Sequence, residues 1–163
     1  MARARNIKPS FFTNDELSEL EPLARLLFIG MWTIADYKGC FEYKPKRVKV
    51  QLLPYDDCDV EQLAINLDKS GFISIYSVHD QLYVKVLNFD KHQNPHKNER
   101  DKGSEIPDIT EADFLYCEKL INNSGLQNIA NNLVKNGTNH DKNGSDRADS
   151  FNLIPDSLNP MLS

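Results

Sequence analysis

Hydrophobic residues between positions 59 and 89 follow first a helical and then a strand-like spacing. Apolar side chains recur at i, i+3, i+4 and i+7, namely at Val60, Leu63, Ala64 and Leu67. This spacing places them on one side of an amphipathic helix whose polar side chains point outward. Asp59 stands in the N-cap position of this helix, where its carboxylate can accept a backbone hydrogen bond.

Two runs rich in Ile, Val, Tyr and Phe follow, at residues 72–78 and 82–89. Gly71 precedes them, at a position where helices commonly end in a left-handed residue. Only His79, Asp80 and Gln81 separate the two runs, which is the spacing of an antiparallel hairpin. A helix followed by such a hairpin predicts a winged helix-turn-helix, an α+β fold of three to four helices and a small antiparallel sheet.

The first forty residues predict two helices. Thr13 and Glu16 have the spacing of a capping box, so a helix is expected to begin at Thr13. Pro22 fits the first turn of a second helix, in which residues 23–35 are apolar almost all the way round. We therefore expect this second helix to be the buried central one, with Trp32 in the core, and residues 40–43 to form a short first strand.

Residues 44–49 form the most basic stretch of the chain, and their periodicity fits two structures. In a helix, Pro45 would occupy the first turn, with Lys46, Arg47 and Lys49 exposed. In a strand, residues 47–52 alternate between polar and apolar residues equally well. The pattern leaves both open.

Composition divides the chain near residue 103. Residues 1–100 carry fourteen Lys and Arg against fourteen Asp and Glu, whereas residues 101–163 carry five against ten. Asn, Asp, Ser and Gly also accumulate in the second part, which is typical of a segment with too little apolar surface for a core. The sequence thus predicts a domain at residues 1–103 and an acidic, partly disordered tail at 104–163 with short helices around 110–135.

Cysteine usage and hydropathy indicate the environment of the chain. Cys40, Cys58 and Cys117 are odd in number and form no CxxC pair, so neither a disulfide framework nor a cysteine zinc site is predicted. The longest apolar run, residues 26–35, is much shorter than the ~20 residues of a membrane span. We expect a chain in a reducing cytoplasm, without membrane contact.

No pattern in the sequence predicts catalysis, a cofactor or a bound metal. Asp56, Asp57, Asp59 and Glu61 are spaced like part of a calcium loop, but the loop's glycine and closing glutamate are missing. A metal-dependent nuclease using Asp90, His92 and His96 is the enzymatic alternative. Since no paired carboxylates, phosphate-binding glycine loop or activated nucleophile accompany them, we expect a protein that is not an enzyme.

Several motifs in the same order resemble one protein family. They are Ile7-Lys8-Pro9-Ser10-Phe11-Phe12, the run Leu23-Ala24-Arg25-Leu26-Leu27-Phe28-Ile29-Gly30, Lys44-Pro45-Lys46-Arg47, Leu53-Pro54-Tyr55-Asp56-Asp57, and Asn88-Phe89 with Lys91-His92-Gln93-Asn94-Pro95-His96-Lys97. Together they resemble the N-terminal winged-helix domain of bacteriophage and prophage replication proteins. The resemblance covers residues 1 to about 100.

This resemblance implies a double-stranded DNA-binding protein that recognises a replication origin or organises a replisome. Host replication proteins, such as a helicase or its loader, are the implied protein partners. The helix after Asp59 takes the recognition position, and residues 72–89 form the wing. The chain gives no indication of oligomeric state.

We infer candidate DNA contacts from three parts of the chain. On the recognition helix, polar side chains able to contact base edges are expected at Gln62, Asn66 and Lys69. Phosphate and base contacts are also expected from basic, amide and imidazole side chains flanking that helix. These are Lys44, Lys46, Arg47, Lys49, Lys91, His92, Gln93, Asn94, His96, Lys97 and Arg100.

Arg3, Arg5 and Lys8 form a short basic arm at the N-terminus. Such arms enter the DNA minor groove in some proteins. At a chain terminus a few basic residues are more simply explained as solvated, which is the interpretation we favour from the sequence.

Two other functions fit the same fold. In the first, the winged helix is a protein-interaction module in which acidic residues engage a basic partner. In the second, the protein is a transcriptional regulator of a mobile element. Only the position of the bound DNA site in the genome distinguishes such a regulator from a replication protein.

Overall fold

The computed structural model describes residues 3–117, which fold as an α+β unit with an antiparallel sheet. The α+β class expected from the sequence is therefore confirmed. The helices are α1 (Asp15–Ser18), α2 (Pro22–Ile34), α3 (Pro45–Leu52), α4 (Val60–Lys69), α5 (Phe89–His92) and α6 (Lys97–Asp101), with 3₁₀ turns η1 (Pro9–Phe11) and η2 (Ile109–Glu111). The strands are β1 (Cys40–Glu42), β2 (Ile73–Val78), β3 (Gln81–Val86) and β4 (Phe114–Leu115).

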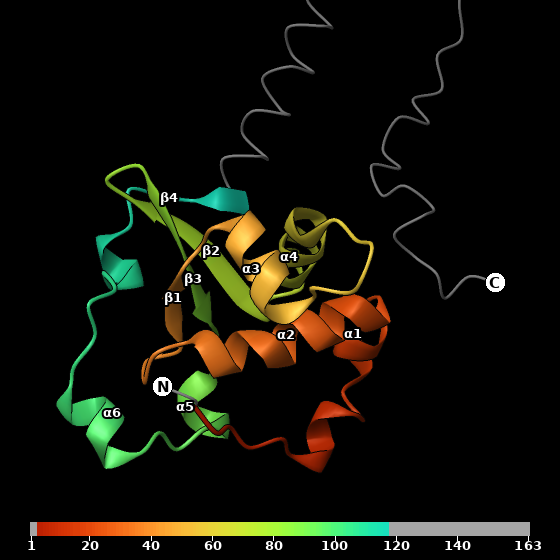
Figure 1. The fold of residues 1–163 in the computed structure, drawn as a ribbon, viewed down its shortest axis with the longest axis horizontal. Helices are drawn as coiled ribbons and strands as arrows, with labels where there is room; N and C mark the ends of the chain where they lie inside the picture. The colour runs from red at the N-terminus through yellow and green to blue at the C-terminus, as the bar shows by residue number, and fades with distance from the viewer. Residues whose placement is uncertain (1–2, 118–163) are drawn as a thin grey trace, which may run out of the picture. The chain divides into compact units, whose positions relative to one another are not determined.

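The central strand pair of the sheet is the β2–β3 hairpin, and the strand order is β1-β3-β2-β4. β1 lies antiparallel to β3 with Phe41 opposite Val84. Along the chain, α2 is followed by β1, α3, α4 and the hairpin (Figure 1). The hairpin turn contains only His79 and Asp80, both with positive φ, because Gln81 already pairs with Val78. The loop is therefore one residue shorter than the sequence indicated.

The core lies between one face of the sheet and helices α2, α3 and α4. Leu27 and Met31 of α2 are fully buried, and Trp32 is 7% exposed. The expected central helix and core tryptophan are thus confirmed. α4 contributes the apolar stripe expected from its spacing, and Asp59 caps it by accepting from the Gln62 backbone N–H at 3.1 Å.

Two glycines are required by the local backbone. Gly71 ends α4 with φ of 79°, in the region that residues with a Cβ rarely adopt. Gly39 has φ of 84° in the turn before β1, and a Cβ there would lie 2.7 Å from the Phe89 side chain. Gly39 therefore allows the ring of Phe89 to seal the core beside the turn. The helix α2 ends before this turn, at Ile34, so Gly39 is not its C-terminal residue.

The first helix begins one residue later than the capping-box pattern predicts. The N-cap is Asn14, whose side-chain Oδ1 accepts from the Leu17 backbone N–H at 2.8 Å. The prediction that Thr13 forms a capping box at the start of this helix is therefore wrong. Thr13 and Asn14 are adjacent and both residue types are common N-caps, so the spacing to Glu16 selected the wrong one.

Residues 104–115 belong to the folded unit, although the sequence places them in the tail. Ser104 Oγ donates to the Asp36 carboxylate, and Tyr76 OH donates to the Pro107 carbonyl at 2.7 Å. β4 then pairs with β2, with Leu115 opposite Tyr76. Residues 104–115 thus belong to the same unit as residues 3–103, so the predicted boundary at residue 103 falls inside this unit. The predicted tail helices lie mostly outside the described residues.

Candidate nucleic-acid interface

α4 presents a polar surface on the side opposite its apolar stripe. Gln62 and Lys69 are exposed and Asn66 is half-buried. Gln62 Nε2 donates to Asn66 Oδ1 at 2.9 Å, one helical turn away. This bond orients two amide groups along the outer surface of the helix, where each retains further donors and acceptors.

Asp68 does not contribute to that outer surface. Its Oδ2 accepts from the Ile75 backbone N–H at 2.9 Å, so the carboxylate faces β2. Burial raises the pKa of Asp68 above its usual value, and the bond from Ile75 opposes that shift. Glu61 is consequently the exposed carboxylate of α4 within the described chain.

The basic segment that fitted two structures is the helix α3, with Pro45 in its first turn. Its four cations differ in environment. Lys44 forms an ion pair with Glu42 at 2.8 Å, and Lys49 Nζ donates to the carbonyls of Leu53 at 2.6 Å and Asp56 at 2.5 Å. Lys46 and Arg47 are exposed, without a hydrogen bond or ion pair to other described residues.

Lys49 is therefore removed from the set of candidate DNA contacts. Its ammonium binds the C-terminal carbonyls of α3 and fixes the turn into α4, a role that cations commonly take at helix C-termini. Lys46 and Arg47 of α3, with Gln62, Asn66 and Lys69 of α4, form the set of outward polar side chains that we call the α3–α4 face.

Arg47 also lines a cleft of about 460 Å³ between α3, β1 and the chain after α6. Cations and carboxylates are mixed around it, with Arg3 and Lys102 near Glu42 and Glu105. Such a mixture does not favour phosphate binding inside the cleft. Arg47 is therefore a candidate phosphate contact through its exposed guanidinium only.

The tip of the β2–β3 hairpin has no cationic side chain. It consists of His79 and Asp80, and Asp113 Oδ2 accepts from the His79 backbone N–H at 2.6 Å. This second carboxylate adds negative charge beside the tip. Insertion of the hairpin tip into a DNA minor groove is not favoured by this arrangement.

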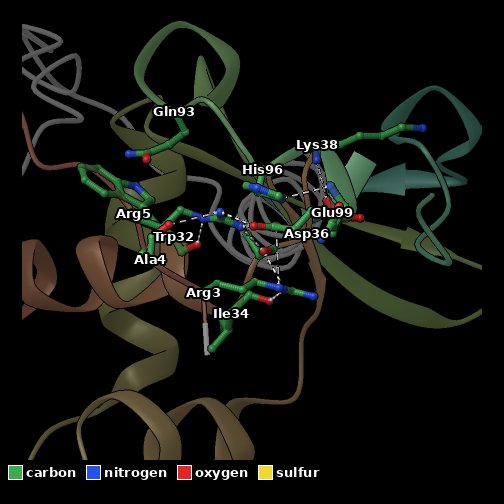
Figure 2. A network of polar contacts seen from close by, with 12 residues as sticks. Arg3, Ala4, Arg5, Trp32, Ile34, Asp36, Lys38, Gln93, His96 and Glu99 are labelled. Carbon is green, nitrogen blue, oxygen red and sulfur yellow. Dashed lines mark hydrogen bonds and ion pairs between the residues drawn. The ribbon is translucent and has the colours of Figure 1, made fainter. Parts of the chain in front are cut away.

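The basic N-terminal arm is fixed to the fold. Figure 2 shows Arg3 and Arg5 directed at the end of α2 and at Glu99 of α6. Arg5 donates to both Glu99 carboxylate oxygens at 2.9 and 2.8 Å and to the carbonyls of Trp32 and Ala35. Its side chain is only 4% exposed. The arm is thus neither simply solvated, as we expected, nor available to enter a groove.

The segment at residues 91–100 forms two short helices separated at Pro95, and much of its polar chemistry is internal. Gln93 is 6% exposed, and its amide exchanges two hydrogen bonds with the Asn6 backbone, at 2.9 and 2.7 Å. His96 caps α6 by accepting from the Asn98 N–H at 3.2 Å. Arg100 donates to Asn94 at 2.6 Å. Gln93 is therefore removed from the candidate set.

The remaining cations of this segment lie outside the α3–α4 face. Lys91, His92 and Lys97 are exposed on α5 and α6. In Figure 1, α2 lies between α5 and the pair α3 and α4. Glu99 of α6, in contrast, lines the same cleft as Arg47 of α3. The structure therefore spreads the predicted contacts over several elements instead of bringing them together around α4.

The sequence interpretation overlooked one residue next to the α3–α4 face. Tyr55, in the turn between α3 and α4, is 99% exposed. A fully exposed tyrosine offers a ring and a hydroxyl that can contact sugar and phosphate. Its position in a Pro-Tyr-Asp-Asp turn was the available signal, because turns of this composition lie at the surface.

The described part of the chain contains no group of three or more His, Cys, Asp or Glu side chains able to hold a metal ion. None of its helices has the length and apolar character needed to cross a bilayer. Comparisons of the chain with models of protein families, with curated proteins and with solved structures gave no match.

Proposed function

We propose that residues 22–86 form a winged-helix module that binds double-stranded DNA. The observation that carries the proposal is the order α2, β1, α3, α4, β2, β3, with a sheet in which β1 pairs with β3 and β3 with β2. A winged helix-turn-helix has this order, with the second helix of the pair α3 and α4 in the recognition position.

The polar side chains on these helices support that assignment. Gln62 and Asn66 form a linked amide pair on the outer side of α4, and amide side chains pair well with adenine in the major groove. Lys46 and Arg47 are exposed on the preceding helix, which in this motif crosses the DNA backbone. α4 thus supplies base contacts, and α3 supplies phosphate contacts.

The resemblance to phage and prophage replication proteins supports a role in replication. We propose that the module recognises an origin or organises a replisome, with a host helicase or helicase loader as protein partner. The hairpin tip, with Asp80 and the adjoining Asp113, does not contribute to DNA affinity in this proposal. Binding rests on α3 and α4.

The direct test is selection of bound duplexes from a random pool with the full chain, followed by titrations of the selected site at several salt concentrations. Lys46→Ala with Arg47→Ala should weaken binding to all sequences. It should also lower the slope of log K against log salt by about 1.8, because each lost phosphate contact removes about 0.9. Lys38→Ala is the matched control, since Lys38 is exposed in the turn before β1.

A second substitution tests the base contacts. Gln62→Ala should relax sequence preference by about 1 to 3 kcal/mol at one base pair while leaving the salt slope unchanged. If the full chain selects no duplex at low salt, or if the Lys46 and Arg47 double variant binds as tightly as the unchanged protein, DNA binding by this face is refuted.

A further inference from the structure

A second cleft lies on the other side of α2 from α3, and it is independent of the proposed DNA contacts. Its volume is about 330 Å³, and it is bounded by η1, α1, α2, the end of α4 and α5. This volume is near the lower limit of the range of about 300–1,000 Å³ typical of ligand sites. It can admit one or two side chains of a partner.

The floor of this cleft is aromatic. Phe11 lies edge-on to Trp32 with ring centroids 5.7 Å apart, and Phe28 contacts both Trp32 at 5.2 Å and Phe72 at 5.4 Å. All four rings line the cleft. An aromatic or aliphatic side chain that enters the cleft would be removed from water and would contact the edges and faces of these rings. Both changes favour binding.

The rim carries charges of both signs at separate places. Lys8 and His92 line the cleft on the side of the arm and α5, where Lys8 Nζ donates to the Lys91 carbonyl at 3.1 Å. Glu16 of α1 also lines the cleft. A ligand with a carboxylate next to its apolar group is therefore complementary to the side formed by Lys8 and His92.

Apolar surface continues outside the cleft along the same chain segment. Ile7 is 48% exposed and Phe12 is 66% exposed, and the Phe12 ring lies 5.1 Å from that of Phe11 in an edge-to-face contact. A single small molecule would occupy the cleft alone, whereas an extended peptide can cover these flanking side chains as well. The arrangement favours a peptide.

A nucleic acid is less suited to the same place. Phosphate groups bind along a series of cations, but here Glu16 and the C-terminal end of α4 at Ser70 complete the rim. The carbonyl end of a helix repels anions. One carboxylate near Lys8 is compatible with this rim, and a continuous phosphate backbone is not.

We propose that this cleft is a docking site for a short acidic peptide segment of a partner protein. An aromatic or large aliphatic side chain of the peptide enters the cleft above Phe28 and Trp32, and a neighbouring Asp or Glu contacts Lys8 and His92. Adjacent apolar residues of the peptide cover Ile7 and Phe12. This binding requires neither DNA nor the α3–α4 face.

Trp32 provides the readout, because it is the only tryptophan of the chain and lines the cleft. The probe is a short synthetic peptide with one phenylalanine flanked by aspartates, titrated into the full chain without DNA while Trp32 fluorescence is followed. We expect a saturable change. A peptide with alanine in place of phenylalanine should cause none, which tests the cleft without altering the protein.

Charge reversal tests the rim. Lys8→Glu with His92→Glu should weaken peptide binding about tenfold, because two attractive contacts become repulsive. Both side chains are exposed, and circular dichroism checks that the variant is folded. Lys38→Glu reverses the charge of one lysine outside the cleft, as Lys8→Glu does on its rim, and this control should bind like the unchanged protein.

Four results would overturn the proposal. They are no saturable signal with the phenylalanine peptide, equal binding of the alanine peptide, equal loss in the Lys38→Glu control, and unchanged binding in the double variant. Competition of a DNA oligonucleotide with the peptide for the Trp32 signal would assign the cleft to nucleic acid instead. Failure of the DNA selection described above leaves the peptide titration unaffected, so the two proposals are tested separately.

Discussion

Cations around α6 and cations on the α3–α4 face differ in how far they are committed to holding the fold together. Arg5 is 4% exposed and donates to Glu99 and to two backbone carbonyls. Lys46 and Arg47 are exposed and contact no described hydrogen-bond acceptor. Charge in the sequence is therefore a poor measure of charge available to a ligand, since the structure uses part of it internally.

The difference has a geometric cause. The planar guanidinium of Arg5 has enough donors to satisfy a carboxylate and the carbonyls at the end of α2 at the same time. Helix ends leave such carbonyls without partners. Lys46 and Arg47 lie on exposed positions of α3, whose buried residue is Val48, and neither has a hydrogen bond or ion pair to another described residue.

The largest expected effect is on stability at Arg5. Arg5→Ala should lower the free energy of unfolding by about 3 kcal/mol, because it removes both hydrogen bonds to the Glu99 carboxylate and the side-chain donor of the Trp32 carbonyl, and leaves Glu99 only the ion pair with Arg3 at 3.9 Å. Lys46→Ala should change it by less than about 0.5 kcal/mol. Urea unfolding followed by circular dichroism measures both. Equal stabilities of the two variants would remove the basis of the comparison.

A smaller effect is expected for the two glutamines. Gln93→Ala should cost about 2 kcal/mol, because the Asn6 N–H and carbonyl lose both partners in a buried position. Gln62→Ala, on exposed α4, should cost about 0.5 kcal/mol or less. Thermal unfolding of both variants at matched concentration provides the measurement. A Gln93 variant as stable as the Gln62 variant would show that the Asn6 contact is dispensable.

The two lysines of α3 give a closer comparison within one helix. Lys49→Ala should destabilise the protein by about 1 kcal/mol, since its ammonium bridges the Leu53 and Asp56 carbonyls. It should leave the salt dependence of DNA binding unchanged, whereas Lys46→Ala should alter that dependence and leave stability unchanged. Finding both changes in one variant would mean that the structural and binding roles are not separated along α3.

The smallest effect concerns acid stability. Hydrogen bonds from Arg5 hold the pKa of Glu99 below its usual value. Because the folded pKa is depressed, this contribution is complete above the unfolded value of about 4.3 and is lost as pH falls through the folded pKa. The free energy of unfolding, measured from pH 6 to 3 over a range of about three units around that value, should therefore fall more steeply with decreasing pH for the unchanged protein than for Glu99→Gln. Parallel pH profiles would contradict this assignment.

The sequence predicted those features that depend on local periodicity. The stripe at Val60, Leu63 and Leu67 identified α4, and the apolar run after Pro22 identified α2. The stretch at residues 44–49 stayed open because helix and strand periods coincide over so few residues. In the structure Val48 is buried whereas Val50 is 71% exposed, which fits the helix, because a strand would place both side chains on the same face.

Long-range polar pairing was beyond the sequence. Arg5 and Glu99 are 94 positions apart, and Asn6 and Gln93 are 87 apart, so no spacing rule links them. The same applies to β4, whose two residues, Phe114 and Leu115, carry no strand pattern of their own. Among the candidate DNA contacts, Gln93 was removed for this reason. Lys49 was removed because it binds carbonyls at and after the end of its own helix, which the spacing of apolar residues does not reveal.

The short strand β4 has a consequence for the behaviour of the protein at high concentration. Without it, β2 would offer a row of unpaired backbone groups to which a neighbouring molecule could add a strand, the usual first step of sheet-mediated aggregation. Phe114, Leu115 and the Asp113 N–H, which donates to Ser77 at 2.8 Å, occupy this margin over the middle and end of β2. Truncation before residue 113 would therefore expose the edge of β2 and make the shortened protein more prone to aggregation.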